Sequence, residues 1–262
     1  MRTLLFVLFG MAVAAAPVVY AESAERTPIL VLHEATHEGL PSAETIWSLN
    51  ALNPTFVLYE DGMVIFKKER RSSESFSAQL TPEQMHALLG ELNVKEFLTL
   101  EEAYSTNNHL EQPGTVIKYW QDHAMKRVMV SGQIRESAED RNRAPQAFLR
   151  MFDRLTGFHH ENARVWVPET LEIHVIPYTN SEGIPVAWPK DWPDLDDETT
   201  KDTTEYIGTG ESYNLYLSGD RREEFEQLLS NLAEKQAVLM NGRQWYVSPW
   251  RYCLPNEDVW KD

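Results

Sequence analysis

The sequence predicts an α+β protein in which antiparallel sheets pack against amphipathic helices. Two apolar runs flank Asp61-Gly62 within residues 55–68, TFVLYEDGMVIFKK, which is the pattern of a tight β-hairpin. Residues 81–92 and 144–155 each carry an apolar stripe at helical spacing. The pattern of strand, capped helix and strand recurs later in the chain, so we expect two weakly similar halves.

The predicted hairpin is apolar on both of its faces. An Asp-Gly pair favours a two-residue type I′ turn, because both central residues of that turn need a positive φ. Since both faces must be covered, we expect other strands and helices to pack around the hairpin. The faces that this turn predicts are Val57 and Tyr59 with Val64 and Phe66, and Phe56 and Leu58 with Met63 and Ile65.

The N-terminal half, residues 22–160, alternates between strand and helix patterns. A β-rich run over residues 28–32 leads into a loop, and a second hairpin is expected around residues 121–123. The helix over residues 81–92 starts with Thr81 as its N-cap, followed by Pro82 and by Gln84, which completes a capping box. The apolar stripes of the two helices are Met85, Leu88, Leu89 and Leu92, and Phe148, Met151, Phe152 and Leu155.

The C-terminal half, residues 161–262, begins with a strand over residues 171–178. An acidic loop rich in Trp and Pro follows over residues 180–210. A strand over residues 213–217 then leads to Ser218, a candidate cap for a helix with its apolar stripe over residues 225–232. The last predicted strand covers residues 244–252.

Residues 1–21 have the pattern of a secretory signal peptide. Arg2 precedes an apolar run over residues 4–20, and small residues near its end indicate cleavage after Ala21. An N-terminal membrane anchor is the alternative, but a run of roughly 16 residues is short for a spanning helix of about 20. We therefore expect a soluble periplasmic or secreted protein with no transmembrane segment after cleavage.

Cys253 is the only cysteine in the chain. No intramolecular disulfide is therefore expected, even in an oxidising compartment. Cys253 also lies far from the signal, so no lipobox cysteine is available for acylation. Its Trp- and Tyr-rich surroundings favour a buried, inert thiol over a nucleophile.

The chain is strongly acidic, with 24 Lys and Arg against 40 Asp and Glu and a formal net charge of −16. Nucleic acid and anionic lipid are poor partners for such a chain. The same acidity confers solubility without any charged partner, and we expect a monomer.

Residues 33–37 read HEATH, a formal H-E-x-x-H motif. On a helix, this spacing places two imidazoles on one face as zinc ligands, with the Glu beside the metal-bound water. That interpretation gives a zinc-dependent hydrolase with His33 and His37 as ligands and Glu34 as the general base. However, a β-rich run precedes the motif, and Gly39 and Pro41 follow it, so an extended segment with a coincidental match fits better.

Residues 194–205 resemble a calcium loop, because carboxylates stand at relative positions 1, 3, 5, 9 and 12. However, Thr199 occupies the position where such a loop needs Gly, and Lys201 occupies the usual apolar position. A solvated acidic loop is the favoured interpretation, with weak calcium binding as the alternative. The candidate ligands are Asp194, Asp196, Glu198, Asp202 and Glu205.

Tryptophans gather in the C-terminal half. Exposed rings could stack on sugars or peptide, whereas buried rings are large core side chains. Residues 188–193, WPKDWP, mix Pro and Trp and so place rings near a loop surface. A ligand platform formed by Trp188, Trp192 and Trp250 is therefore a hypothesis.

Short motifs in a fixed order run through most of the mature chain. They are a strand leading to Glu38-Gly39 and Pro41, then FxLYxDGxVI over residues 56–65, AWP over residues 187–189 with Leu195, WY at residues 245–246, Arg251, and LPxE over residues 254–257. With these motifs, the chain resembles a loose family of exported bacterial proteins, many of them actinobacterial lipoproteins, that have no assigned biochemical activity. The resemblance implies that residues 33–41 form a strand end and a Gly-containing loop without zinc-ligand histidines.

This chain departs from the similar proteins at three points. It has no lipidated N-terminal Cys and no second Cys to pair with Cys253, and Tyr252 stands where the similar proteins tend to have Pro. Neither lipid anchoring nor a disulfide is therefore carried over. We expect an exported, non-enzymatic interaction module of the envelope or the extracellular space, without a cofactor. A zinc-dependent hydrolase and a calcium-binding exported protein are the alternatives.

Overall fold

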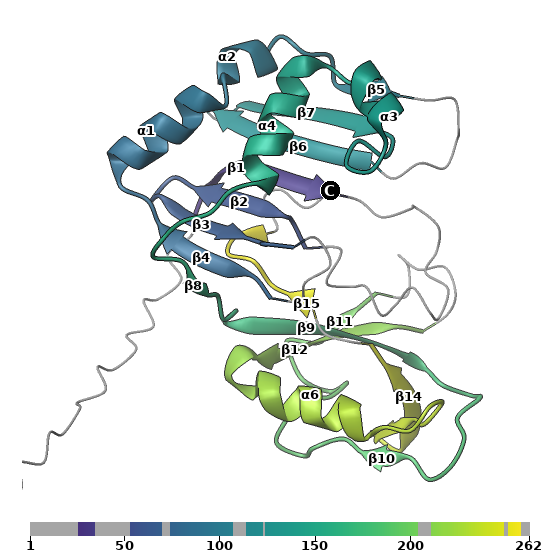
Figure 1. The fold of residues 1–262 in the computed structure, drawn as a ribbon. Coiled ribbons are helices and arrows are strands. Elements are labelled where there is room, and N and C mark those ends of the chain that lie inside the picture. Colours follow the sequence, from purple (N-terminus) through teal and green to yellow (C-terminus); the bar gives the residue numbers. More distant parts are fainter. Residues whose placement is uncertain are drawn as a thin grey trace, which may run out of the picture.

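The computed structural model describes residues 26–34, 53–69, 74–106, 114–122, 124–203, 211–248 and 251–257. These residues form two mixed sheets and a small number of helices (Figure 1), which confirms the predicted α+β class. The predicted signal peptide over residues 1–21 lies outside the described residues.

The first sheet comes from the N-terminal part of the chain. Its strands are β1 (Pro28–Glu34), β2 (Phe56–Tyr59), β3 (Met63–Phe66), β4 (Phe76–Gln79), β5 (Ala103–Ser105), β6 (Gly114–Gln121), β7 (Ala124–Ser131) and β8 (Arg164–Val165). They lie in the order β5-β7-β6-β1-β2-β3-β4-β8, and every neighbouring pair except β5–β7 is antiparallel. The predicted first strand and both predicted hairpins are confirmed, whereas β4, β5 and β8 were not predicted.

The prediction of a two-residue turn between β2 and β3 is wrong, because the turn contains three residues, 60–62. Gly62 has a φ of +84°, and its N–H donates to the Tyr59 carbonyl at 3.0 Å. Asp61 does not have the positive φ that a type I′ turn requires, and its carboxylate instead accepts the Met63 N–H at 3.0 Å. The additional turn residue shifts the register by one, so that the predicted grouping of side chains on the two faces is also wrong.

The hairpin contributes one face to each of two cores. Phe56, Leu58, Val64 and Phe66 belong to the first core, beneath the helices of the N-terminal half. Val57, Tyr59 and Ile65 belong to the second core, on the opposite face of the sheet. The expectation that both faces of the hairpin are covered is therefore confirmed.

The first core is closed by α1 (Pro82–Glu91), α2 (Val94–Phe97) and α4 (Gln146–Thr156), and α3 (Ala138–Arg143) precedes α4. The capping box of α1 is present, because the Thr81 hydroxyl accepts the Gln84 N–H at 3.3 Å and the Gln84 side chain accepts the Thr81 N–H at 2.9 Å. The predicted stripe of α4 is buried at no more than 2% exposure. Both predicted helices are thus confirmed.

The second sheet comes from the C-terminal part of the chain. Its strands are β9 (Thr170–Pro177), β10 (Val186–Ala187), β11 (Lys201–Asp202), β12 (Tyr213–Ser218), β13 (Val238–Met240), β14 (Arg243–Val247) and β15 (Arg251–Tyr252). Their order is β10-β13-β14-β9-β12-β11, and β15 also pairs with β9. The described part of the predicted loop over residues 180–210 therefore contains two short strands, and the predicted last strand is divided into β14 and β15.

Helix α6 (Arg222–Asn231) packs on the second sheet through Phe225, which is fully buried. A short 3-10 turn, η2 (Gly219–Arg221), precedes it, and the Ser218 side chain makes no cap hydrogen bond, so the predicted cap is wrong. The backbone at Gly219 lies against the preceding linker, since its N–H donates to the Glu169 carbonyl at 2.8 Å and a Cβ there would stand 1.7 Å from the Pro168 oxygen. The α-helix begins three residues later, at Arg222.

The second core joins residues from both predicted halves. Val31, Val57, Tyr59 and Ile65 of the first sheet belong to the same buried cluster as side chains of the second sheet and the C-terminal segment. In addition, the Tyr59 hydroxyl donates to the Pro255 carbonyl at 3.2 Å. Packing thus crosses the boundary predicted at residue 160.

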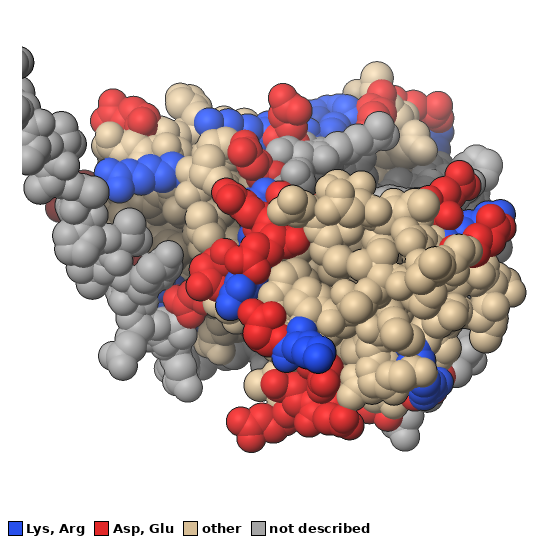
Figure 2. All heavy atoms as spheres, turned by 90° about the horizontal axis from the view of Figure 1, so that it is seen from below, with Lys and Arg blue, Asp and Glu red and all other residues tan. Residues whose placement is uncertain are grey.

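Charged side chains are unevenly distributed over the surface. Seen from below, the molecule shows a band of Asp and Glu beside a broad area without charged side chains (Figure 2). Ile184 and Leu239, near the β10–β13 end of the second sheet, are 84% and 41% exposed. Among the described residues, no helix is both long enough and apolar enough to cross a bilayer.

Candidate functional site

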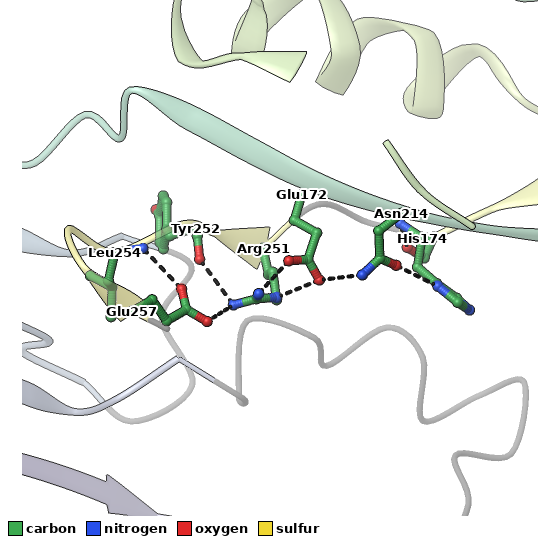
Figure 3. Close-up of polar contacts among 8 residues, drawn as sticks. Glu172, His174, Asn214, Arg251, Tyr252, Leu254 and Glu257 are labelled. Carbon is green, nitrogen blue, oxygen red and sulfur yellow. Dashed lines mark hydrogen bonds and ion pairs between the residues drawn. The ribbon is translucent and has the colours of Figure 1, made fainter. Parts of the chain in front are cut away.

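The two faces of the second sheet differ in character. On β9, Leu171, Ile173 and Val175 are buried in the second core, whereas the alternate residues Glu172 and His174 point to the other side. The register aligns Asn214 with His174, and both Tyr216 and Arg251 with Glu172. We call Glu172, His174, Asn214, Tyr216 and Arg251 the polar face of the second sheet. Figure 3 shows Glu172, His174, Asn214 and Arg251 below β9, with α6 on the opposite side of the sheet.

Arg251 lies at the centre of the polar face, between the carboxylates of Glu172 and Glu257. Its Nε donates to Glu172 Oε1 at 2.8 Å, its Nη2 pairs with Glu172 Oε2, and its Nη1 donates to Glu257 Oε1 at 2.5 Å. The three side chains are only 9%, 11% and 10% exposed. Burial lowers the pKa of Arg251, but the hydrogen bonds and charges of the two glutamates outweigh burial, so this pKa lies above its ordinary value.

Asn214 extends the network from Glu172 to His174. Its Nδ2 donates to Glu172 Oε1 at 3.0 Å, so its Oδ1 is the atom that faces His174 Nδ1 at 2.8 Å. Because an amide oxygen only accepts, His174 Nδ1 carries a proton, and in the uncharged form of the ring Nε2 is then the acceptor. The backbone of His174 is also fixed, since its N–H donates to Ser248 Oγ at 3.0 Å.

Tyr216 lies beside Glu172 on the polar face. Burial, together with the negative charge of Glu172, raises the pKa of Tyr216 to about 12. Its hydroxyl therefore keeps its proton at neutral pH and can donate as well as accept. The Lys201 ammonium lies 5.2 Å from the centre of the Tyr216 ring. The polar face thus offers an imidazole nitrogen, a hydroxyl and a nearby cation.

The two described residues of the HEATH motif belong to a strand. His33 and Glu34 are the last residues of β1 and pair with β6. Glu34 is 5% exposed, and its carboxylate accepts Arg135 Nε at 2.9 Å, Arg135 Nη2 at 2.7 Å and Thr55 Oγ1 at 2.8 Å. The helical spacing that the zinc motif needs is therefore not present at His33 and Glu34, and His37 lies outside the described residues.

Lys67 is a buried ammonium group on the same side of the molecule as Glu34. It is 3% exposed, and burial lowers its pKa to about 8, with partial opposition from the charge of Glu34. We expect this group to make the free energy of unfolding rise with pH between about 8 and 10.5, because the unfolded chain binds a proton there that the folded chain has released. The increase should be on the order of 3 kcal/mol.

Urea unfolding of the wild type and Lys67→Met across this pH window measures the increase. The variant should lose most of the rise with pH. Lys68→Met is the matched control, since the neighbouring Lys68 side chain is exposed and its removal should leave the rise in place. The same pH dependence in all three proteins would contradict the assignment to Lys67.

The carboxylates of Asp194 and Asp196, two of the candidate calcium ligands, accept hydrogen bonds from the protein itself. Asp194 Oδ1 accepts the Asp196 N–H at 2.9 Å, and Asp196 Oδ2 accepts Asn241 Nδ2 at 2.7 Å. Asp202 belongs to β11, Glu198 is exposed, and Glu205 lies outside the described residues. Within the described ranges, no three His, Cys, Asp or Glu side chains are arranged to hold a metal ion.

Two of the three tryptophans proposed as a ligand platform lie in the second core. Trp188 and Trp192 are each 7% exposed and contact one another edge to face, with ring centres 5.2 Å apart. The Trp188 Nε1–H donates to the Pro193 carbonyl at 2.9 Å, and both rings pack against Phe225. Trp250 lies outside the described residues.

The polar face was not among the sites predicted from the sequence. The signal for it is the alternation of polar side chains along β9 and β12, where residues 172 and 174 face residues 216 and 214. Comparisons with protein-family models, with curated proteins and with solved structures found no match to this chain.

Proposed function

We propose that the protein is an exported binding module that contacts a protein partner of the envelope or the extracellular space through the polar face of the second sheet. One observation carries the proposal. Glu257, Arg251, Glu172 and Asn214 form a continuous hydrogen-bonded chain that fixes the His174 ring and leaves Nε2 as its acceptor. An acceptor held in place before binding loses little conformational freedom when it meets a donor, which favours recognition.

The neighbouring surface suits a protein partner. Tyr246 follows along the same face of β14 and contacts Tyr178 edge to face, with ring centres 5.8 Å apart. Further along, Gln244 of β14 stands opposite Leu239 of β13 in the sheet, and both side chains are exposed. From His174 to Leu239, this surface therefore changes from polar to aromatic to apolar over a short distance, a composition that is typical of protein interfaces.

Site-specific photocrosslinking in the cell tests the proposal. With the photoreactive residue p-benzoyl-phenylalanine at Gln244, we expect a crosslinked product that His174→Ala weakens strongly. The control position is Met125, which is 45% exposed on β7 of the first sheet and should give no such product. No product from Gln244, or the same product from both positions, would overturn the proposal.

The zinc-dependent hydrolase and the calcium-binding protein stay as alternatives. Stoichiometric zinc in the purified mature chain that is lost in His37→Ala would support the hydrolase, with Glu34 as its base. A rise in the thermal unfolding midpoint on addition of calcium would support binding by residues 194–205.

A further inference from the structure

A pocket of about 360 Å³ opens at the edge of the first sheet, where β3, β4 and β8 end. It is separate in the sequence and in the fold from the polar face of the second sheet. Its lining includes Arg26, Met63, Ser77, Gln79, Asn162 and Arg164.

The register explains why these side chains meet. Met63 pairs with Gln79, and Ser77 pairs with both Ile65 and Arg164, so all five lie on one face of the sheet. On this face, Ile65 is buried in the second core, and Met63 packs against the same core. The pocket therefore has an apolar floor next to polar walls.

The walls of the pocket carry two guanidinium groups in a chain whose net charge is −16. Arg26 Nη1 pairs with Asp61 Oδ2 at 2.5 Å. The Arg164 side chain is exposed, and its guanidinium group makes no hydrogen bond or ion pair with any residue that the structure describes. None of the described residues therefore neutralises the positive charge of Arg164 at the pocket. The Asn162 amide and the Ser77 hydroxyl add neutral hydrogen-bonding groups.

We propose that this pocket binds a small organic anion, whose carboxylate or phosphate group contacts Arg164 and Arg26 while its apolar part lies against Met63. The planar donors of a guanidinium match the oxygens of both anionic groups. The inference does not depend on the proposed function, since it uses a different surface and a different class of ligand.

Calorimetric titration of the full mature chain with butyrate and with inorganic phosphate tests this site. We expect saturable binding of at least one probe with a Kd of about 1 mM, weakened about 10-fold or more in Arg164→Gln. Arg150→Gln is the matched control, because Arg150 is an exposed arginine on α4, 47% exposed, and its loss should leave the affinity unchanged.

The two probes also distinguish the possible ligands. If butyrate binds more tightly than phosphate, and Met63→Ala weakens its binding, the ligand is a carboxylate with an apolar body. If phosphate binds more tightly, and Met63→Ala leaves its affinity unchanged, the ligand carries a phosphate group. Absence of saturable binding by both probes would overturn the proposal. So would equal weakening by Arg164→Gln and Arg150→Gln, because the effect would then come from overall charge.

Discussion

Replacing Arg251 by Met should lower the free energy of unfolding by roughly 3–5 kcal/mol. The reason is the burial of its partners, since the Glu172 and Glu257 side chains are only 11% and 10% exposed. Without the guanidinium, two carboxylates would face one another away from water, and each would lose its strongest hydrogen-bond donor. Urea unfolding at neutral pH, followed by circular dichroism, measures the loss.

The chain offers a matched control for this prediction. Arg243 also donates two hydrogen bonds to one carboxylate, that of Glu211, but the two side chains are 52% and 34% exposed. Arg243→Met should therefore cost about 1 kcal/mol or less. Adding Glu172→Gln and Glu257→Gln to Arg251→Met should recover part of the stability, because no buried negative charge would then lack a partner. Equal losses in the two arginine variants would contradict the argument.

Tyr59→Ala and Phe56→Ala should each lower the free energy of unfolding by roughly 3–5 kcal/mol. Both side chains are fully buried on β2, but Phe56 belongs to the first core and Tyr59 to the second. Tyr59→Ala also removes the hydrogen bond to the Pro255 carbonyl. Since one strand serves both cores, each substitution should shift the same cooperative transition.

Two probes separate the possible outcomes. Tryptophan fluorescence reports mainly on the second core, which contains Trp166, Trp188, Trp192 and Trp245, whereas far-ultraviolet circular dichroism reports on both sheets. The two signals should change together in the wild type and in both variants. Separate transitions, with Phe56→Ala shifting only one of them, would show that the two parts of the chain unfold independently.

Local signals made α1 and α4 predictable. Thr81 and Gln84 stand three residues apart and satisfy one another's backbone N–H groups, so the start of α1 needs no information from elsewhere in the chain. The apolar stripe of α4 likewise follows from the spacing of its own residues.

The hairpin turn was harder to predict because an Asp-Gly pair fits more than one turn length. A contact outside the hairpin accompanies the longer turn, since the Leu80 N–H at the end of β4 donates to the Gly62 carbonyl at 2.9 Å. A Cβ at position 62 would also stand 2.5 Å from the Leu80 oxygen. The register was therefore set partly by a strand that the sequence did not reveal.

The polar face depends on contacts between distant positions. Arg251 and Glu172 are 79 residues apart, and His174 and Asn214 are 40 apart. The pattern of a single strand shows that Glu172 and His174 share a face, but not which residues stand opposite them. The burial of Trp188 and Trp192 also depends on a residue that is distant in the sequence, since Phe225 of α6 packs against both rings. The sequence around the two tryptophans therefore could not show whether they are buried.

The hydrogen bond between Tyr59 and Pro255 spans 196 positions of the sequence, and β15 pairs with β9 close by. Such contacts give the fold a high contact order, which slows folding because long loops must close first. The second core also cannot be completed before residues 252–254 have been synthesised. A chain that ends before residue 251 would therefore leave one apolar face of the β2–β3 hairpin without its C-terminal cover, a species prone to aggregation and open to proteases.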